Sequence, residues 1–284
     1  MPDVTIFEMG PRDGLQNEAA MIATADKVRL VDMLTDAGFS KIEVASFVSP
    51  KWVPQMADGA DVLAAIARAP GVAYTALTPN LKGFERAVAS NVDEIAIFGS
   101  ASEGFSHSNL GRGRVAALEM FAPVAEAARA QGVKMRGYVS CVVECPFDGP
   151  VAPKDVADAV AAMLAMGCYE VSLGDTIGRG TPDSIAAMLD AVLAIADPQH
   201  LAGHYHDTNN RALESIAVSL DKGLTTFDAA VGGLGGCPYA PGAKGNVATE
   251  AVVEMVEARG LSTGIDHAKL AKAATFAKTL RDMT

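Results

Sequence analysis

Two of the five histidines in the chain, His204 and His206, stand two residues apart in the segment His204-Tyr205-His206-Asp207. Side chains alternate between the two faces of a β-strand, so both imidazoles point the same way, ~7 Å apart along a strand. Two imidazoles on one face can bind one cation. A single histidine is more often a packed or surface residue, but the spacing of this pair favours metal ligation.

Oxygen donors that could complete such a site follow other apolar runs of the sequence. Asp13 comes after the first run and Asn246 after the last. One carboxylate, two imidazoles and one amide oxygen suit an octahedral Mg²⁺ or Mn²⁺ with positions left for substrate. Zinc would more often recruit thiolates. We therefore expect Asp13, His204, His206 and Asn246 to bind Mg²⁺ or Mn²⁺.

Further polar residues of catalytic type lie at comparable places. Arg12 precedes Asp13, Glu43 lies inside the second apolar run, and Asp175 ends the sixth. Cys237 is carried by the glycine-rich segment 232–238, and a thiol on such a loop could deliver or remove a proton. A structural turn with an incidental cysteine is an equally good interpretation of that segment.

These residues need a scaffold, and the sequence alternates between β-rich apolar runs and alanine-rich helical stretches throughout. The expected strands are residues 4–9, 41–47, 72–78, 94–100, 134–142, 169–175, 201–207 and 225–233. The expected helices include 25–37, 81–90, 116–131, 153–166, 182–196 and 211–222, with two more at 247–259 and 265–283. We expect Thr24 to cap the first helix, and we expect Thr181 and Pro182 to start the helix at 182–196.

Strands that alternate with helices predict parallel pairing, and eight units in about 250 residues favour a closed barrel. An open doubly wound sheet is the alternative. We expect one α/β catalytic domain over 1–284, a (β/α)8 TIM barrel over about 4–258 with an extra C-terminal helix at about 265–283 packed over it. In this fold the active site lies at the carboxyl ends of the strands. The candidate residues gather at that end, and the amino ends show no comparable set.

Composition limits the partners of the chain. Its net charge is −11 over 284 residues, which argues against a nucleic-acid partner. No apolar run approaches the ~18 residues of a membrane span. The four cysteines do not form a disulfide framework and indicate a reducing compartment. No basic-then-apolar leader is present, so we expect a cytoplasmic protein, and a homodimer or higher homo-oligomer is the prior for a barrel.

Three segments carry a more specific resemblance. They are the nine residues 10–18 (Gly-Pro-Arg-Asp-Gly-Leu-Gln-Asn-Glu), the eight residues 43–50 (Glu-Val-Ala-Ser-Phe-Val-Ser-Pro), and the glycine-rich segment 232–239 with Gly245-Asn246. Together they resemble 3-hydroxy-3-methylglutaryl-CoA lyase, a member of a metal-dependent barrel superfamily that also contains isopropylmalate and homocitrate synthases. The similarity runs from residue 4 to about 257.

The resemblance implies a retro-Claisen cleavage of 3-hydroxy-3-methylglutaryl-CoA to acetyl-CoA and acetoacetate. It implies that Asp13, His204, His206 and Asn246 bind the cation. Arg12 would stabilise the enolate oxygen and Cys237 would protonate the enolate. Glu43 and Asp175 would orient Arg12 and the metal ligands. The group that takes the hydroxyl proton stays open between His204, Asp13 and a water on the metal.

Other positions depart from the family pattern, which leaves the acyl group open. Ala19 stands where the family has lysine, and Asn209-Asn210 replace an aromatic residue and glycine. Arg112 and Arg114 follow the fourth strand in place of the usual Asn-x-Asn-Cys-Ser continuation and could meet the CoA phosphates, as could Asn80, although a solvated pair of arginines is an equal interpretation.

Three alternatives to this function remain at the level of sequence. One is a lyase for a related 3-hydroxyacyl-CoA. Another is a Claisen-type enzyme that condenses an acyl-CoA with a 2-oxo acid on the same fold, although such synthases usually add a long C-terminal extension. The last is a non-catalytic barrel that binds metal and acyl-CoA. The residue types at Arg12, Glu43 and Cys237 speak against a non-catalytic barrel.

Overall fold

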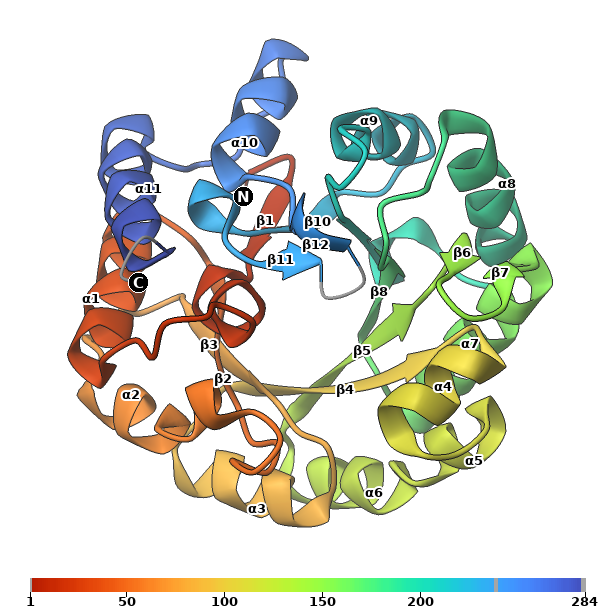
Figure 1. Cartoon of the computed structure of the whole chain (residues 1–284), viewed down its shortest axis with the longest axis horizontal. Coiled ribbons are helices and arrows are strands. Elements are labelled where there is room, and N and C mark those ends of the chain that lie inside the picture. The colour runs from red at the N-terminus through yellow and green to blue at the C-terminus, as the bar shows by residue number, and fades with distance from the viewer. Residues whose placement is uncertain (1, 238–239, 282–284) are drawn as a thin grey trace.

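Eight parallel strands close into a barrel in the order β1-β10-β9-β8-β5-β4-β3-β2 (Figure 1). This computed structural model describes residues 2–281 except 238 and 239, and the side chains of 237 and 240–243 lie outside the description. The barrel strands are β1 Thr5–Glu8, β2 Lys41–Ser46, β3 Ala73–Leu77, β4 Glu94–Ser100, β5 Lys134–Ser140, β8 Glu170–Asp175, β9 Leu201–Tyr205 and β10 Thr226–Ala229. The expected (β/α)8 barrel is confirmed, and the open-sheet alternative is wrong.

Helices surround the barrel in an outer ring (Figure 1). They are α1 Thr24–Asp36, α2 Gly59–Ala65, α3 Leu81–Ala89, α4 Glu103–Leu110, α5 Arg114–Glu119, α6 Ala122–Gln131, α7 Pro153–Met166, α8 Pro182–Leu193, α9 Ala212–Asp221, α10 Thr249–Ala258 and α11 His267–Arg281. The single helix expected at 116–131 is wrong. The chain breaks between α5 and α6, where Pro123 occupies the first turn of α6 and offers no amide to continue the preceding helix.

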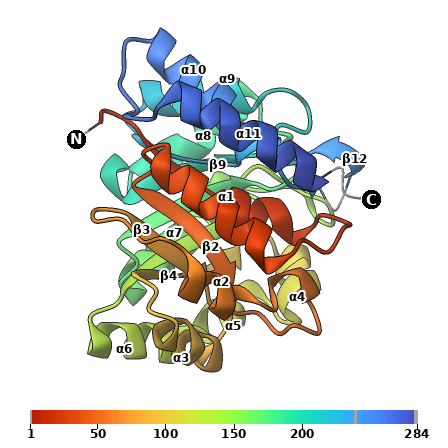
Figure 2. The same cartoon turned by 90° about the vertical axis from the view of Figure 1, so that its left-hand side faces the viewer.

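The C-terminal helix α11 lies in the outer ring beside α1 rather than over the barrel, as Figures 1 and 2 both show. It buries one face that includes Leu270, Ala273 and Ala277. The expected end of this helix at 283 lies outside the described residues. Among the described residues, no helix has both the length and the apolar character needed to cross a bilayer.

Two of the strands that end earlier than the sequence predicts matter for the site. Strand β10 ends at Ala229 because the chain turns at Gly232 and Gly233, whose φ values of 66° and 63° favour glycine. Strand β9 ends at Tyr205, and His206 follows it in an isolated antiparallel bridge to Asn246. The backbone of the last barrel loop is therefore joined directly to the histidine segment.

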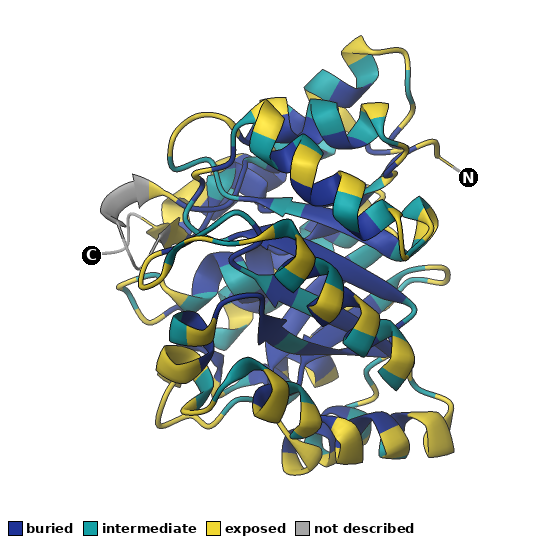
Figure 3. Cartoon of the chain, turned by 90° about the vertical axis from the view of Figure 1, so that its right-hand side faces the viewer, coloured by how far each residue is buried: buried dark blue, intermediate teal, exposed yellow. Residues whose placement is uncertain are grey.

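The side chains of the strands alternate between a polar barrel interior and an apolar layer under the helices. In β8, Glu170 and Ser172 contact polar groups inside the barrel, whereas Val171 and Leu173 belong to the apolar core. Figure 3 shows the barrel strands as mostly buried and the helices as exposed on their outer faces. Ionised groups inside the barrel are therefore shielded from water, and they need partners there.

The amino end of the barrel also carries a polar cluster, contrary to the sequence-based expectation. Nζ of Lys41 donates to Glu94 Oε2 at 3.0 Å and to the Tyr169 hydroxyl at 2.7 Å, and that hydroxyl donates to Glu94 at 2.7 Å. The three residues start or precede three different strands. This end of the barrel serves stability in such folds, so we assign the cluster to closing the interior.

One predicted helix start is confirmed and one is wrong. Thr181 caps α8 with a reciprocal capping box to Ser184, and Pro182 occupies the first turn. Thr24 does not cap α1, whose N-cap is Ala23; the Thr24 hydroxyl donates instead to Asp58 at 2.8 Å. Thr24 therefore fixes α1 to the start of α2.

Candidate metal centre at the barrel mouth

Three side chains from distant parts of the sequence meet at the carboxyl end of the barrel. Asp13 comes from a π-helical turn, Gly10–Gly14, directly after β1, and His204 and His206 come from the end of β9. Asp13, His204 and His206 each offer one ligand atom, and these atoms lie within 4.8 Å of one another. The structure thus brings together three of the four predicted ligands in an arrangement that one divalent cation can occupy.

The hydrogen bonds indicate which nitrogen of each imidazole faces the cation. Nδ1 of His204 lies 3.1 Å from Asp228 Oδ2, which leaves Nε2 of His204 for the cation. Nδ1 of His206 is buried, and it has no hydrogen-bond partner within the part of the chain that the structure describes. Buried polar atoms are rarely left unpaired, and a ligated ion is one explanation when they are. The residues present therefore fit a metal ion, which Nε2 of His204 and Nδ1 of His206 would bind.

The charge states of the ligands also suit a cation. Although burial disfavours its charge, Arg12 and then the two histidines lower the pKa of Asp13 to about 2, so it is a carboxylate at neutral pH. Burial and the neighbouring His204 lower the pKa of His206 to about 4. His206 is therefore a neutral imidazole with a lone pair available, as metal ligation requires.

Asn246, the fourth predicted ligand, lies beside the others but turns its amide nitrogen toward them. Nδ2 donates to Asp13 Oδ2 at 2.8 Å and to the carbonyl of Leu234 at 3.3 Å. The oxygen and nitrogen of an asparagine amide exchange places by rotation of the terminal group. The location of Asn246 agrees with the prediction, and ligation through its oxygen stays a prediction.

Arg12 is fixed next to the ligand group by two acids. Its Nε lies 2.5 Å from Glu43 Oε2, and its Nη1 donates to Asp13 Oδ1 at 2.7 Å. Although burial opposes the charge, Glu43 and Asp13 raise the pKa of Arg12 above its usual value. The guanidinium is thus a permanent cation, held in one plane at the edge of the ligand group.

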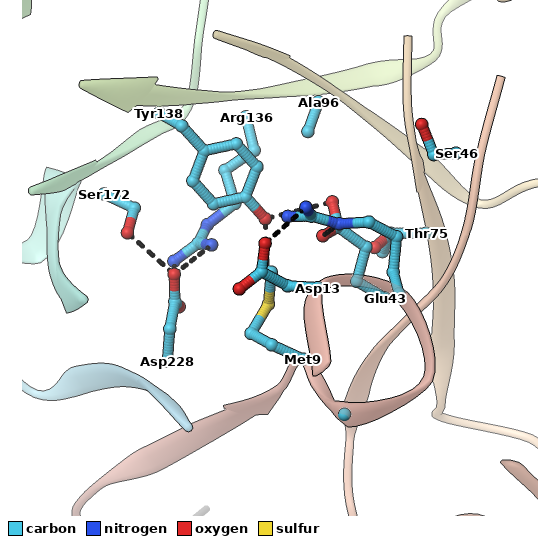
Figure 4. A network of polar contacts seen from close by, with 12 residues as sticks. Met9, Asp13, Glu43, Ser46, Thr75, Ala96, Arg136, Tyr138, Ser172 and Asp228 are labelled. Carbon is cyan, nitrogen blue, oxygen red and sulfur yellow. Dashed lines mark hydrogen bonds and ion pairs between the residues drawn. The ribbon is translucent and has the colours of Figure 1, made fainter. Parts of the chain in front are cut away.

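Tyr138 of β5 holds the other side of Glu43, and sequence reasoning missed it. Its hydroxyl donates to Glu43 Oε1 at 3.0 Å, and the Arg12 guanidinium lies 5.8 Å from its ring centroid. Figure 4 shows Tyr138 between Glu43 and Arg136, with Asp13 below. The available signal was the alternation of the strand, which places Arg136 and Tyr138 on the same inward face.

A second missed residue is Asp228, in the middle of β10. Its carboxylate accepts from His204 Nδ1 and pairs with Arg136, whose Nη2 lies 2.8 Å from Oδ1 (Figure 4). Glu170 binds the remaining edge of Arg136, with Oε1 at 2.7 Å from Nε. The sequence signal for each of these three was a charged residue at a strand position that faces the barrel interior.

Two predicted residues make contacts that differ from the roles expected of them. Asp175 was expected to orient Arg12 and the metal ligands, but its two oxygens accept from the amides of Arg179 and Gly180 at 3.1 and 2.7 Å. It therefore fixes the loop after β8. Asn80, a candidate for CoA, is the N-cap of α3, and its side chain accepts from the amide of Gly83 at 2.9 Å.

The two arginines predicted to meet CoA phosphates differ in their surroundings. Arg114 is paired with Asp155 at 3.0 Å and Glu103 at 3.3 Å, and it donates to the carbonyl of Ala101. Its charge is thus already compensated. Arg112 is exposed in the short connection between α4 and α5, so it is the better candidate of the pair for an external phosphate.

Cys237 lies in β11 (Gly236–Cys237), which forms a hairpin with β12 (Ala240–Lys244) after the last barrel strand. The Cys237 side chain lies outside the described part of the structure, so its predicted role is untested. The base of the hairpin is joined to the loop after β9: Lys244 Nζ lies 3.0 Å from Asp207 and 2.7 Å from Asn210. Asn210 has a φ of 58°, a conformation that asparagine tolerates better than most residues.

A closed barrel with a candidate metal centre and a buried arginine at its mouth defines a (β/α)8-barrel enzyme of the metal-binding kind. The family comparison narrows that class. A family model described as HMGL-like matches residues 3–277, and the chain belongs to this family.

Named relatives and solved structures agree with the family. A Pseudomonas aeruginosa protein named 3-hydroxy-3-isohexenylglutaryl-CoA/hydroxy-methylglutaryl-CoA lyase is 54% identical over 93% of this chain and 88% of its own length. The mitochondrial hydroxymethylglutaryl-CoA lyase of Gallus gallus is 52% identical over 96% of this chain and 92% of its own. A crystal structure of the HMG-CoA lyase from Brucella melitensis is 58% identical, with a TM-score of 0.98 over 99% of this chain and all of that one.

Proposed function

We propose that the protein is a carbon–carbon lyase that cleaves 3-hydroxy-3-methylglutaryl-CoA to acetyl-CoA and acetoacetate in the presence of a divalent metal. The observation that carries the proposal is the convergence of Asp13, His204 and His206 beside Arg12. The names of the relatives, each a lyase at about half identity over nearly the whole chain, support cleavage over the condensing alternative.

Asp13, His204 and His206 would hold the cation, with Asn246 as a fourth ligand. A divalent cation at this place supplies Lewis acidity to oxygens of the substrate. Mixed carboxylate and imidazole donors without a thiolate favour Mg²⁺ or Mn²⁺. Asp13 is the candidate among these residues for the group that takes the proton of the 3-hydroxyl, because Asp228 engages Nδ1 of His204 and the cation would engage Nε2.

Arg12 would stabilise the charge that develops during cleavage. Loss of the hydroxyl proton leaves an alkoxide on C3. As its C3–O bond becomes the carbonyl of a ketone, the C2–C3 bond breaks and the electron pair of that bond passes into the thioester as an enolate. A fixed guanidinium beside the enolate oxygen lowers the free energy of that anion without having to reorient. Glu43 and Tyr138 would act through Arg12, because they determine where the guanidinium lies.

Cys237 would complete the reaction by donating its thiol proton to C2 of the enolate, which gives acetyl-CoA. Support for this role comes from the family resemblance and from the position of Cys237 in the hairpin after β10. The hairpin is joined by Lys244 to the loop that follows the histidines, so a thiol carried there belongs to the same end of the barrel.

A second candidate function is cleavage of a 3-hydroxyacyl-CoA with a longer branch at C3. The relative from Pseudomonas aeruginosa is named for both an isohexenyl and a methyl substrate, and this chain is 54% identical to it. The departures from the family pattern at Ala19, Asn209 and Asn210 are compatible with a different substituent at C3.

The direct test is release of acetoacetate by purified protein treated with EDTA and then supplied with Mn²⁺ or Mg²⁺. We expect cleavage of 3-hydroxy-3-methylglutaryl-CoA, loss of activity with EDTA, and recovery on addition of metal. 3-Hydroxy-3-isohexenylglutaryl-CoA in the same assay, with its own ketone product measured, distinguishes the second candidate. Cys237→Ala should lower turnover by several orders of magnitude and leave metal binding intact. No ketone from either thioester would overturn the proposal.

We further propose that the protein works in a reducing compartment such as the cytoplasm, as a homo-oligomer. The three cysteines whose side chains are described, Cys141, Cys145 and Cys168, are free and buried, which supports a reducing compartment. Cell fractionation tests the location, and light scattering coupled to gel filtration tests self-association.

A further inference from the structure

We propose that Asp228 is a positioning residue for the metal centre: it holds the proton of His204 on Nδ1, so that the lone pair of Nε2 faces the cation. Arg136 in turn fixes Asp228. The inference deepens the proposed function, because it concerns the same cation, but the hydrogen bonds that carry it lie within the chain itself.

The barrel register places the two residues opposite each other. Strands β9 and β10 are neighbours and parallel, and Asp228 and His204 are register partners. Nδ1 of His204 lies 3.1 Å from Asp228 Oδ2. The side chain of Asp228 is fully buried, whereas that of His204 is 14% exposed. The contact therefore runs from the closed interior to the open mouth.

Asp228 can act only as an acceptor in this place. Arg136 binds it with two nitrogens, Nη2 at 2.8 Å from Oδ1 and Nη1 at 3.0 Å from Oδ2, and Ser172 donates to Oδ2 at 2.7 Å. A bidentate guanidinium favours the ionised carboxylate. Since a carboxylate has no proton to give, the hydrogen bond to His204 requires a proton on Nδ1. The lone pair of the neutral ring is then on Nε2.

Arg136 is itself fixed from the opposite side. Its Nε donates to Glu170 Oε1 at 2.7 Å, and its side chain is 2% exposed. The connected groups Glu170, Arg136, Asp228 and His204 come from β8, β5, β10 and β9, four consecutive strands of the barrel. Because each member is held by the next, the His204 ring cannot rotate without losing its hydrogen bond to the buried Asp228, whose pairing with Arg136 is drawn in Figure 4.

The arrangement has a measurable consequence for metal binding. A carboxylate bonded to the distal nitrogen of a ligating imidazole fixes the ring and increases its donor strength, and loss of such a partner lowers metal affinity about 10- to 100-fold. Asp228→Asn keeps the size of the side chain but removes the charge and one acceptor. Ser172→Ala is the matched control, since it removes a different hydrogen bond to the same oxygen.

The test combines metal affinity with the tautomer of His204. Manganese binding to metal-free protein is followed by calorimetry or by the electron paramagnetic resonance of free Mn²⁺. We expect Asp228→Asn to raise the Kd about 10- to 100-fold, and Ser172→Ala to change it by less than about threefold. In ¹⁵N-histidine spectra of the metal-free protein, recorded at alkaline pH so that the ring is neutral and assigned with His204→Gln, wild-type His204 should be the Nδ1–H tautomer. Asp228→Asn should lose that preference.

The wild-type spectrum alone can overturn the inference, so the test does not depend on the folding of a variant. An Nε2–H tautomer at His204 would contradict it. So would an Asp228→Asn protein that binds Mn²⁺ as tightly as wild type. Failure of the wild type to bind any divalent metal would instead contradict the proposed function, while the tautomer would still decide the role of Asp228.

Discussion

Nε of Arg12 lies 2.5 Å from Oε2 of Glu43, within the mouth of the barrel and away from solvent. This contact fixes the direction in which the guanidinium points toward the ligand group. We expect Glu43→Gln to lower kcat about 100-fold, because a displacement of a catalytic group by about 1 Å has an effect of that size. The KM for the acyl-CoA should change by less than about threefold, since the role lies in the transition state.

Tyr138→Phe is the comparison variant for the effect of Glu43→Gln on kcat. It removes the hydrogen bond to the other oxygen of Glu43 and leaves the contact to Arg12 in place. Its effect on kcat should therefore be smaller, about tenfold. Steady-state kinetics with saturating Mn²⁺ give both values, and an unchanged kcat in Glu43→Gln would refute the positioning role.

Metal affinity should decrease as the solution becomes more acidic. Although burial opposes the charged form, Asp228 raises the pKa of His204 above its ordinary value of 6.5. A proton therefore competes with the cation for His204 already near neutral pH. His206, with a pKa lowered to about 4, binds no proton in that range. Calorimetry at pH 6, 7 and 8 in buffers of different ionisation enthalpy should show weaker binding and about one proton released at pH 6. A pH-independent affinity would contradict this.

The strand pattern was largely predictable, because β-rich apolar runs recur in this chain with regular helical stretches between them. The ends of the elements were less so. The end of β10 at Ala229 is shown only by the backbone angles at Gly232 and Gly233. The division between α5 and α6 depends on Pro123 alone. In both cases the conformational preference of a few turn residues determines where the element ends.

For the site, residue type and spacing predicted the ligand group but not the residues behind it. His204, His206 and Asp13 could be found because each is an unusual residue at a strand end. Asp228 and Tyr138 could not be assigned roles, because Asp228 pairs with Arg136 and Tyr138 donates to Glu43 across the barrel interior, between strands that are far apart in the sequence. The contacts of Asp175 were not predicted for a different reason, since its partners are backbone amides of its own loop, whose conformation the residue types do not specify.

Glu8 should connect the loops after β1 and β10 to the start of α10, and it should make the stability of the protein depend on pH. It is fully buried, and its oxygens accept from the amides of Gly10 and Val231 and from the hydroxyl of Thr249, at 2.8, 2.9 and 2.7 Å. Glu8→Ala leaves three donors without a partner and should lower the free energy of unfolding by about 3 kcal/mol. Glu8→Gln should lower it less.

Burial raises the pKa of Glu8 from 4.5 to about 8. Because the folded protein keeps this proton to a higher pH than the unfolded chain does, its contribution to stability is complete below about 4.5. It is lost as the pH rises toward 8. Urea unfolding of wild type and Glu8→Gln between pH 5 and 9 should show that the advantage of wild type shrinks with rising pH. An advantage that grows with pH would contradict the raised pKa.

Arg112 and Arg114 should respond differently to removal of their charge. Arg112 is exposed, so Arg112→Ala should raise the KM for acyl-CoA about threefold with little change in kcat, if it meets a phosphate of the carrier. Arg114 is already paired with Glu103 and Asp155. Arg114→Ala should therefore leave KM unchanged and lower stability by about 1 kcal/mol. Equal KM effects in the two variants would refute the distinction.

The position of the metal ion is the claim on which the account depends most. A crystal of the protein soaked in Mn²⁺ and measured near the manganese absorption edge tests it directly. We expect one anomalous peak about 2.0–2.3 Å from Nε2 of His204, Nδ1 of His206 and a carboxylate oxygen of Asp13. Full occupancy of a different site, or a peak that touches neither histidine, would contradict the account.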